Sequence, residues 1–371
     1  MNPPRVVHIV LGLSIGGLER VVVNLARGLQ RLGFQNDVVC LEQGGEFASE
    51  LATAGIPVHV WNKRPGMDWS AIGRLASFLR TEKIAIVHTH NPTPHFHGAM
   101  AALLARTTAL VHTKHGRNYP ENRKRVFLNR LLASVTDAIV PVSDNAAQVA
   151  LQIERVNPRK LRRIWNGVDT ELYKPRIRSS LTETTPPVLG TVARLSAEKD
   201  QKTLLRAFQL LRQTPLPPPL PRLVFVGDGP RRVELQDEAQ RLGVNASVDF
   251  LGIRSDVATL LPSFTLFTLS SITEGISMTI LEAMACALPV VATDVGGNRE
   301  IVNPPQCGLI VPPRNPQALA AAWLELLRNP TRRMEMGIAA RNRVVTHFSV
   351  HHMVNQYATL YRELLQTNRA N

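Results

Sequence analysis

The chain has 371 residues, of which 44% are hydrophobic and 19% charged, and this composition excludes both a disordered protein and a small disulfide-stapled scaffold. Lys and Arg outnumber Asp and Glu by 43 to 29, so nucleic acid, an anionic membrane or a phosphorylated ligand are the partners that the charge favours. Aromatic residues make up only 5% of the chain, which argues against a single-strand nucleic-acid binder that stacks bases on aromatic rings.

The length predicts two domains, or one large one, and the positive charge is concentrated in the first half. Residues 1–180 carry 24 basic and 13 acidic side chains, whereas the remainder carries 19 and 16. Two groups of basic residues lie close together in the sequence: Lys114, Arg117, Arg123, Lys124, Arg125 and Arg130, and then Arg155, Arg159, Lys160, Arg162 and Arg163. We expect this half to face an anionic surface or ligand.

Neither the cysteines nor the apolar runs indicate secretion or membrane insertion. Cys40, Cys286 and Cys307 lie in apolar surroundings without CxxC spacing, so neither a disulfide framework nor a thiolate metal site is expected. Residues 6–13 are too short to span a bilayer and lack a cleavage site, and residues 257–272 are interrupted by proline and hydroxyl residues. We expect a cytoplasmic protein, free or peripheral on the cytoplasmic face of the membrane.

Short β-branched runs alternate with helical patterns from the start of the chain. Residues 6–11 predict a strand, and apolar residues between 18 and 32 follow at helical spacing after a glycine-rich turn. Further strands are predicted at residues 37–41, 84–88, 109–113, 138–142 and 162–165. This alternation predicts a parallel sheet covered by helices on both faces.

The second half repeats the architecture after a connection at residues 173–187, which are rich in proline, serine and threonine. Its strands are predicted at residues 188–193, 223–226, 247–251, 266–270, 289–292 and 308–311. Residues 214–221 are proline-rich and predict a stiff surface loop, with a polyproline ligand as the alternative. The fold class is therefore α/β, with two Rossmann-like doubly wound domains whose strand ends face a common cleft.

The first candidate binding motif is a glycine-rich turn between the first predicted strand and the first predicted helix. Its sequence is Gly12-Leu-Ser-Ile-Gly16-Gly17. Its backbone N–H groups can approach an anion or a sugar closely. The spacing differs from the GxGxxG fingerprint, and the chain has no Walker motif, so P-loop ATP hydrolysis has no support. A plain tight turn is the alternative.

In the second half, Arg194 and Lys199 follow the end of a predicted strand. Open parallel sheets bind ligands at that end. A guanidinium fork and an ammonium point charge together suit a diphosphate. The alternative is a surface pair that solvates the start of a helix.

Two carboxylates, Glu274 and Glu282, are separated by seven residues at a junction of strand, loop and helix. They converge on one ligand only if Glu274 lies in the loop and Glu282 in the helix, because eight helical residues turn through roughly 800°. Gly275 supports such a loop. A helix N-terminus near Ser277 then directs N–H groups at a phosphate, while the carboxylates accept hydrogen bonds from vicinal hydroxyls of a sugar or ribose.

These motifs occur in the order seen in retaining glycosyltransferases of family 4, which the chain resembles along nearly its whole length. The matching segments are residues 16–19, 166–169, 194–199, 227–230 and 274–297. Within the family, Glu-Gly followed by Ile-Ser is most similar to transferases of exopolysaccharide assembly. The resemblance implies a GT-B fold with an acceptor-side domain at 1–175, a donor domain at 186–347 and a C-terminal helix at 348–371. That helix carries an apolar stripe and is expected to return to the first domain, although an ordinary packed helix fits the same stripe.

The resemblance also implies roles for individual residues. Arg194 and Lys199 would hold the donor diphosphate, Glu282 the ribose hydroxyls and Glu274 the transferred sugar, while His115 matches the histidine that faces the reacting sugar. The remaining donor-binding residues would be Gly16, Gly17, Gly252, Ile253, Arg254, Gly275, Ile276 and Ser277, with Gly252, Ile253 and Arg254 beside the nucleobase. The catalytic set is His115, Arg194, Lys199 and Glu274. Neither a cofactor nor a metal is expected.

Other histidines lie at strand ends. His88 and His90 either line the acceptor side or are structural, and a structural role is the commoner one for such a residue. A metal site that combines them with His95 and His97 lacks a carboxylate or thiolate complement.

The function predicted is retaining transfer of a sugar from a nucleotide-diphosphate sugar, a UDP-sugar, to a hydroxyl acceptor. The acceptor would be a lipid-linked or growing saccharide in exopolysaccharide or cell-envelope glycan synthesis, and no nucleic-acid partner is expected. The family pattern favours attack on the face that the leaving group departs from. Two alternatives stay open: a nucleotide-sugar epimerase or hydrolase of the same fold, and a non-enzymatic protein that binds anionic surfaces.

Overall fold

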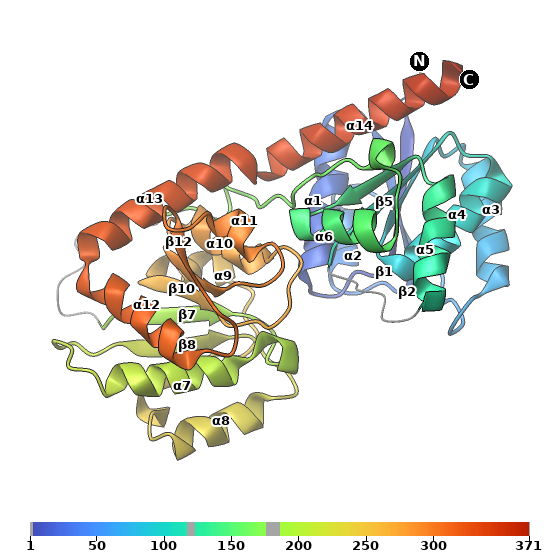
Figure 1. The fold of residues 1–371 in the computed structure, drawn as a ribbon. Helices are drawn as coiled ribbons and strands as arrows, with labels where there is room; N and C mark the ends of the chain where they lie inside the picture. Colours follow the sequence, from blue (N-terminus) through green and yellow to red (C-terminus); the bar gives the residue numbers. More distant parts are fainter. Residues whose placement is uncertain (1–2, 117–122, 176–185, 371) are drawn as a thin grey trace. The chain divides into compact units, whose positions relative to one another are not determined.

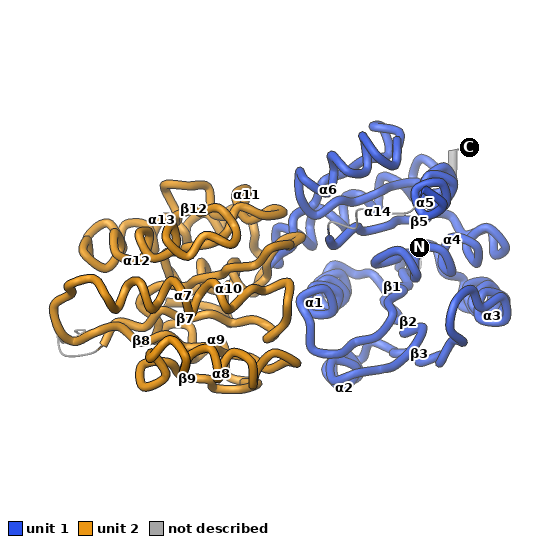
Figure 2. The backbone as a smooth tube through the Cα atoms, turned by 60° about the horizontal axis from the view of Figure 1, so that its bottom comes forward, with its two compact units in different colours: residues 1–167, 350–371 blue, residues 168–349 orange. Residues whose placement is uncertain are grey.

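The computed structural model describes residues 3–116, 123–175 and 186–370. The chain folds into two compact units, and each unit has its own β-sheet. Unit 1 comprises residues 1–167 and 350–371, and unit 2 comprises residues 168–349 (Figure 2). Among the described residues, no helix is both long and apolar enough to cross a membrane.

Unit 1 is built on a six-stranded parallel sheet with the order β3-β2-β1-β4-β5-β6. Figure 1 shows the ribbon of the chain, with β1, β2 and β5 of this sheet labelled. Its strands are β1 (Arg5–Gly12), β2 (Gln35–Gln43), β3 (Val58–Val60), β4 (Ile86–His90), β5 (Ala109–Lys114) and β6 (Ala138–Pro141). Its helices are α1 (Gly17–Arg31), α2 (Phe47–Thr53), α3 (Trp69–Thr81), α4 (Pro92–Ala105), α5 (Arg123–Val135), α6 (Asp144–Gln148) and α14 (Val350–Ala370), with the short turns η1 (Val149–Ile153) and η2 (Pro158–Lys160).

Strand β1 illustrates how this sheet buries both faces. Val7 and Ile9 lie in a core cluster with residues of α3 and α4, while Val10 lies in a second cluster with residues of α1 and α2. Successive side chains of a strand point to opposite faces. The run of β-branched residues in β1 therefore has an apolar partner on each side, as a covered parallel sheet requires.

The C-terminal helix α14 packs against α1 and β5 of unit 1. Its Tyr357 and Tyr361 are completely buried or nearly so. The approach to α1 is close, because a Cβ added at Gly28 would lie 2.4 Å from Cγ2 of Val354. The apolar stripe seen in the sequence is thus the buried face of α14.

Unit 2 has the same sheet order read from its other edge, β12-β11-β10-β7-β8-β9, and it is also parallel throughout. Its strands are β7 (Val188–Val192), β8 (Arg222–Val226), β9 (Val248–Phe250), β10 (Leu266–Leu269), β11 (Val290–Thr293) and β12 (Gly308–Val311). Its helices are α7 (Gln201–Arg212), α8 (Arg232–Arg241), α9 (Val257–Leu260), α10 (Met278–Ala285), α11 (Asn298–Val302), α12 (Pro316–Arg328) and α13 (Pro330–His347), with the turns η3 (Ala197–Lys199), η4 (Asn245–Ser247) and η5 (Leu261–Ser263). The predicted pair of doubly wound domains is confirmed.

One predicted strand is wrong and one strand was not predicted. Residues 162–165 do not form a strand, and only Leu161 makes an isolated bridge, to Ile139 in β6. Arg162 N and Ile164 N still donate to the carbonyl oxygens of Ile139 and Pro141 at 3.0 and 3.4 Å, but Pro141 has no N–H with which to return a bond. The short strand β3 at the sheet edge was missed in the sequence.

The boundary between the units lies earlier than the predicted domain end at residue 175. Arg341 in α13 donates to the carbonyl oxygens of Thr170 and Tyr173 at 2.9 and 2.8 Å. Val168 forms a bridge to Ser349 within the same unit. These bonds tie the segment that follows residue 167 to α13. Most of the predicted interdomain connection lies outside the described residues, as does Arg117.

Candidate functional site

Each sheet has one position where the strand order reverses. In unit 1 it lies between β1 and β4, and in unit 2 between β7 and β10. The connections leave such a pair of strands in opposite directions, and ligands of doubly wound proteins bind outside the carboxyl ends of these strands. We therefore examine the residues that follow these strands, unit by unit.

In unit 2, the loops that follow β7 and β10 are bonded to one another. Lys199 Nζ lies 2.5 Å from Glu274 Oε1, which also accepts a hydrogen bond from Ser271 Oγ at 2.6 Å. Ile272 N donates to Glu198 O at 2.9 Å. The side chain of Glu274 is only 9% exposed, against 23% for Lys199. The structure therefore brings together two of the predicted catalytic residues, as a half-buried ion pair.

Arg194 follows β7 with its backbone held and its side chain exposed. Its carbonyl oxygen accepts a hydrogen bond from Gln201 Nε2 at 2.8 Å. A hydrogen bond from Ser196, together with the nearby cations Lys199 and Arg194, lowers the pKa of Glu198. The loop after β7 thus presents two cations at the carboxyl end of the sheet.

The segment from Glu274 to Ser277 is fixed by a second loop, the one after β11. Gly297 N donates to Gly275 O at 2.8 Å. Gly296 has φ +56°, and a Cβ there would lie 2.2 Å from the carbonyl oxygen of Glu274. Only glycine fits this position without moving the backbone that carries Glu274.

Helix α10 begins directly after this loop. Ser277 is its N-cap, and the Ser277 Oγ accepts a hydrogen bond from Ile280 N at 3.4 Å. The first turn of a helix leaves backbone N–H groups without intrahelical partners, so α10 presents donors beside Glu274. Ile276 is buried before the cap, and Glu282 is half-buried within α10. The loop position of Glu274 and the helix position of Glu282 are those that the sequence required for convergence on one ligand.

Gly252, Ile253 and Arg254 form the loop after β9, two strands away from β7. Gly252 has φ +69°, and its carbonyl oxygen accepts a hydrogen bond from Gly227 N at 2.8 Å. Ile253 is 71% exposed. Arg254 forms a two-bond pair with Asp256, at 2.8 and 2.6 Å. The structure does not join this loop to the Lys199–Glu274 pair through any hydrogen bond among the described residues.

In unit 1, the glycine-rich turn leads from β1 into α1. Gly16 is the N-cap of α1 with extended backbone and without a side-chain cap, and Gly17 is the first helical residue. The carboxylate of Glu19 folds over this turn, with Oε2 2.2 Å from where a Cβ of Gly16 would lie. Burial raises the pKa of Glu19. The turn therefore combines helix N–H donors with a half-buried carboxylate.

A cluster of histidines lies at the reversal point of unit 1, on β1, β4 and the residue after β5; those on β1 and β4 are buried and His115 is half-buried. His8 Nδ1 is 3.3 Å from His90 Nε2, and His90 Nδ1 is 2.9 Å from His115 Nε2. His88 is bonded through Nδ1 to Tyr361 OH at 2.6 Å. We call His8, His88, His90 and His115 the histidine cluster.

The membership of this cluster differs from the sequence prediction. His95 stacks on His112 at 3.7 Å and bonds to Thr136, while His97 bonds to Thr93 O. The residue that joins His88 and His90 is instead His8, which the sequence analysis missed. The signal was the register, because β1 and β4 are neighbours and His8 lies directly opposite His88.

The nitrogens of His8, His88 and His90 lie within 4.8 Å of one another, a spacing that a metal ion can use. Every ring nitrogen of the three has a partner within the protein, however: the partners are Asn36, Tyr361, Thr113 and His115, and the His8–His90 contact. A metal would have to replace several of these bonds. The arrangement favours a hydrogen-bonded cluster.

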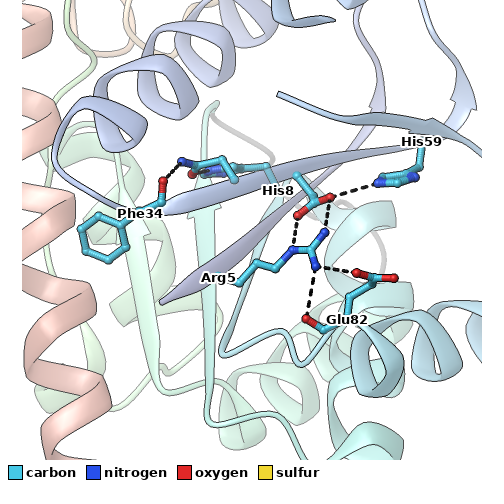
Figure 3. Close-up of polar contacts among 7 residues, drawn as sticks. Arg5, His8, Phe34, His59 and Glu82 are labelled. Carbon is cyan, nitrogen blue, oxygen red and sulfur yellow. Dashed lines mark hydrogen bonds and ion pairs between the residues drawn. The ribbon is translucent and has the colours of Figure 1, made fainter. Parts of the chain in front are cut away.

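Several cations of unit 1 are already paired. At the start of β1, Arg5 donates to Asp37 at 2.7 and 3.1 Å and also contacts Glu82, as Figure 3 shows. Lys114, assigned in the sequence to an exposed basic group, is buried and lies 2.5 and 2.6 Å from the two oxygens of Glu154. The exposed positive charge of this half is therefore smaller than the composition indicates.

Comparisons with known proteins cover both units. Residues 15–172 match the family model described as Glycosyltransferase Family 4, and residues 174–343 match that of Glycosyl transferases group 1. The chain is 25% identical, over 97% of both chains, to UDP-Gal:alpha-D-GlcNAc-diphosphoundecaprenol alpha-1,3-galactosyltransferase of Escherichia coli. It is 29% identical, over 78% of this chain and 79% of the other, to the putative glycosyltransferase EpsD of Bacillus subtilis.

Solved structures share the fold along the whole chain. A glycosyltransferase from Rickettsia africae has a TM-score of 0.87 at 21% identity and covers 98% of this chain and 99% of its own. Anabaena HepE in complex with UDP has a TM-score of 0.84 at 24% identity, with coverage of 97% and 100%.

Proposed function

Because this chain belongs to the family 4 glycosyltransferases and has the GT-B fold, we propose that it transfers a sugar from a UDP-sugar to a hydroxyl acceptor with retention at the anomeric carbon. The observation that supports this most is the Lys199–Glu274 pair, at the reversal point of unit 2 beside the N-terminus of α10. The pair combines a cation for a diphosphate with a carboxylate for sugar hydroxyls.

The difficult charge in such a transfer develops on the departing diphosphate. Arg194 and Lys199, with the N–H groups of α10, would stabilise that charge from fixed positions. Losing one preorganised donor of this kind costs ~3 to 4 kcal/mol, or ~10²- to 10³-fold in rate. Lys199 pairs with Glu274, and a bound diphosphate would take over this contact and free the carboxylate for the transferred sugar.

The other residues would complete donor binding. Glu282, in the second turn of α10, would accept hydrogen bonds from the ribose hydroxyls. Gly252, Ile253 and Arg254 would border the nucleobase. Gly275, Ile276 and Ser277 would line the phosphates. By the family resemblance, Gly16 and Gly17 would close the donor site, and His115 would face the reacting sugar.

Retention would follow from attack on the face that the leaving group departs from, with a donor phosphate oxygen taking the acceptor proton. In this mechanism Glu274 and Glu282 accept hydrogen bonds from hydroxyl groups of the donor, and they do not act as the nucleophile and the general acid of a double displacement. The cations of unit 2 supply the charge that a metal supplies in other transferases, so we expect activity without a divalent metal.

UDP is the nucleotide that the relatives favour. The Escherichia coli relative is named for UDP-Gal, and HepE is described in complex with UDP and with UDP-glucose. The first of these names also contains a lipid-linked acceptor, diphosphoundecaprenol. The Glu274 block of this chain resembles transferases of exopolysaccharide assembly. A lipid-linked or growing saccharide in exopolysaccharide or cell-envelope synthesis is the acceptor that we propose.

Helix α5 supports a peripheral contact with an anionic membrane on the cytoplasmic side. Phe127 is 68% and Leu131 56% exposed, one turn apart on the same face. The first turn of the helix carries the exposed cations Arg123, Lys124 and Arg125. Apolar and basic side chains together on one helix suit the boundary of an anionic bilayer.

The donor assignment is tested by thermal protection. We expect a UDP-sugar to raise the melting temperature more than GDP- or ADP-sugars, and the Lys199→Ala and Glu274→Ala variants to lose that protection. Product analysis with the best donor should then show retained anomeric configuration. Protection by none of the nucleotide sugars would contradict the proposal, and conversion of the donor without any acceptor would indicate an epimerase or hydrolase.

The membrane contact is tested separately, by sedimentation with vesicles at low salt. Phe127→Glu should reduce binding to anionic vesicles, whereas Val233→Glu in unit 2, at an equally exposed position, should not. If both variants bind the vesicles as well as the wild type does, α5 does not contact the membrane.

A further inference from the structure

The histidine cluster contains a directional chain of hydrogen bonds that ends at His115. We infer that Asn36, His8 and His90 hold His115 in one tautomer, with Nδ1 as a hydrogen-bond acceptor for a hydroxyl group of the reacting sugar. The role of His115 toward the sugar rests on the proposed function. The chain of bonds that orients it follows from the structure of unit 1.

The direction of the chain is set at Asn36 in β2. Asn36 Nδ2 donates to the carbonyl oxygen of Phe34 at 3.1 Å (Figure 3). A carbonyl oxygen can only accept, so the amide orientation is fixed. The other end of the amide, Oδ1, lies 3.3 Å from Nε2 of His8. Because Oδ1 can only accept, His8 Nε2 must carry the proton.

The protonated nitrogens of His90 and His115 follow from the proton on His8 Nε2. A neutral imidazole carries one N–H, so His8 Nδ1 is an acceptor, and the ring nitrogen that donates to it across 3.3 Å is His90 Nε2. His90 Nδ1 is then an acceptor in turn. It lies 2.9 Å from His115 Nε2, which must donate. His115 is therefore protonated at Nε2 and carries a lone pair at Nδ1.

This series of hydrogen bonds requires neutral imidazole rings, and the surroundings of the rings keep them neutral. Burial lowers the pKa of His8 to about 4 and that of His115 to about 3. Burial and the neighbouring histidines also lower the pKa of His90 well below its ordinary value. A proton added to His8 or His90 would turn an accepting nitrogen into a donor and break a bond of the series, and one added to His115 would occupy the lone pair of Nδ1.

The last nitrogen of this series of hydrogen bonds, Nδ1 of His115, is expected to be an acceptor. Nδ1 of His115 is buried and has no hydrogen-bond partner among the described residues. A sugar hydroxyl can donate to this lone pair, whereas a phosphate oxygen or an ionised carboxylate cannot. The chain therefore makes His115 selective for hydroxyl donors and unsuited to the diphosphate. Asn36, His8 and His90 are positioning residues in this scheme.

The tautomer is measured by NMR on the full chain labelled with ¹⁵N-histidine, with His115→Ala used to assign the His115 signals. We expect His115 Nδ1 to be unprotonated and Nε2 protonated in the absence of substrate. Asn36→Leu removes the anchor and should allow both tautomers at His115. Tyr361→Phe is the matched control, because it deletes another buried hydrogen bond of the cluster, the one to His88, outside this chain.

Kinetics give a second readout. Loss of one hydrogen bond to the sugar should raise KM for the donor roughly threefold to tenfold in Asn36→Leu, with kcat nearly unchanged, whereas a purely structural defect would lower kcat through loss of folded enzyme. Asn36→Leu should add almost nothing to His115→Ala, since both remove the same interaction.

Three results would overturn the inference. The first is a His115 protonated at Nδ1 in the wild type, and the second is a tautomer that Asn36→Leu leaves unaffected. The third is a stoichiometric divalent metal in the purified wild type that the Asn36→Leu or His8→Ala variant lacks. The NMR result does not depend on catalysis. An inactive protein with the expected tautomer would contradict the proposed function but would still support the series of hydrogen bonds that orients His115.

Discussion

The two sheets share one strand order, yet their reversal points carry opposite chemistry. In unit 1 the position between β1 and β4 holds His8, His88 and His90, which are buried and whose pKa values are lowered. In unit 2 the position between β7 and β10 is followed by the Lys199–Glu274 ion pair, which is partly open to solvent. The same backbone architecture therefore supports a neutral site suited to hydroxyls and a charged site suited to phosphate.

The residues at the reversal points, and not the shared fold, therefore decide the chemistry. Unit 1 uses its buried charges for structure, as in the Lys114–Glu154 pair, with side chains only 7% and 3% exposed. Unit 2 keeps Arg194 exposed and Lys199 within reach of solvent. The comparison predicts that removing a cation from unit 1 lowers stability, whereas removing one from unit 2 lowers activity.

The largest effect is expected in unit 1. Lys114→Ala leaves the carboxylate of Glu154 buried without its cation and should lower the free energy of unfolding by about 3 to 5 kcal/mol. Chemical denaturation measures this loss. The double variant Lys114→Met, Glu154→Leu should recover much of it, because an apolar pair needs no compensation. A single variant as stable as the wild type would contradict a structural role for this pair.

In unit 2, Lys199→Ala should lower kcat/KM by ~10²- to 10³-fold, equivalent to ~3 to 4 kcal/mol, with little change in stability. The half-exposed position of the lysine makes its pair with Glu274 a weak source of folding energy. Lys202→Ala is the control, since Lys202 pairs with Glu234 on the surface of the same unit. Near-normal turnover of Lys199→Ala would break the distinction between the units.

A third change acts on the backbone that carries Glu274. Gly296→Ala places a Cβ 2.2 Å from the carbonyl oxygen of Glu274 at φ +56°, and such strain costs of the order of 1 to 3 kcal/mol. Thermal unfolding should show the loss, together with weaker donor protection. Gly73→Ala in α3 has open space around the added carbon and should be neutral or slightly stabilising. Equal stability of the two variants would remove the proposed constraint on the loop.

Much of this organisation was predictable from the sequence, because it depends on local patterns. The β-branched runs predicted eleven of the twelve strands, and the order of motifs indicated both the two-unit fold and the family. Glu274 lies in a loop and Glu282 in a helix, the condition that helical geometry set for their convergence on one ligand, and Gly275 indicated that loop.

The remainder depended on contacts between distant segments. His8 joins His90 only because β1 lies beside β4, and nothing in the local sequence marks it. Lys114 seemed part of a basic surface because its partner Glu154 is forty residues away. The predicted strand at 162–165 faces Pro141 in β6, which accepts a bond from Ile164 N but has no N–H with which to return one.

The smallest effect concerns pH and the charged network at the start of β1. Burial alone would raise the pKa of Asp37, but the hydrogen bonds from His59 and Arg5 outweigh it and lower the pKa below the ordinary 3.8. The ionised form is therefore favoured in the folded protein, so its contribution is complete above the unfolded pKa and is lost as the pH falls through the folded one.

Asp37→Asn should consequently cost about 1 kcal/mol near neutral pH and flatten part of the decline in stability below about pH 4. Denaturation midpoints measured from pH 7 to pH 3 would show the two curves converging in acid. Parallel curves would mean that Asp37 has the same pKa folded and unfolded. The result sharpens the comparison between the units, because a carboxylate of unit 1 would then be assigned to stability and Glu274 of unit 2 to substrate.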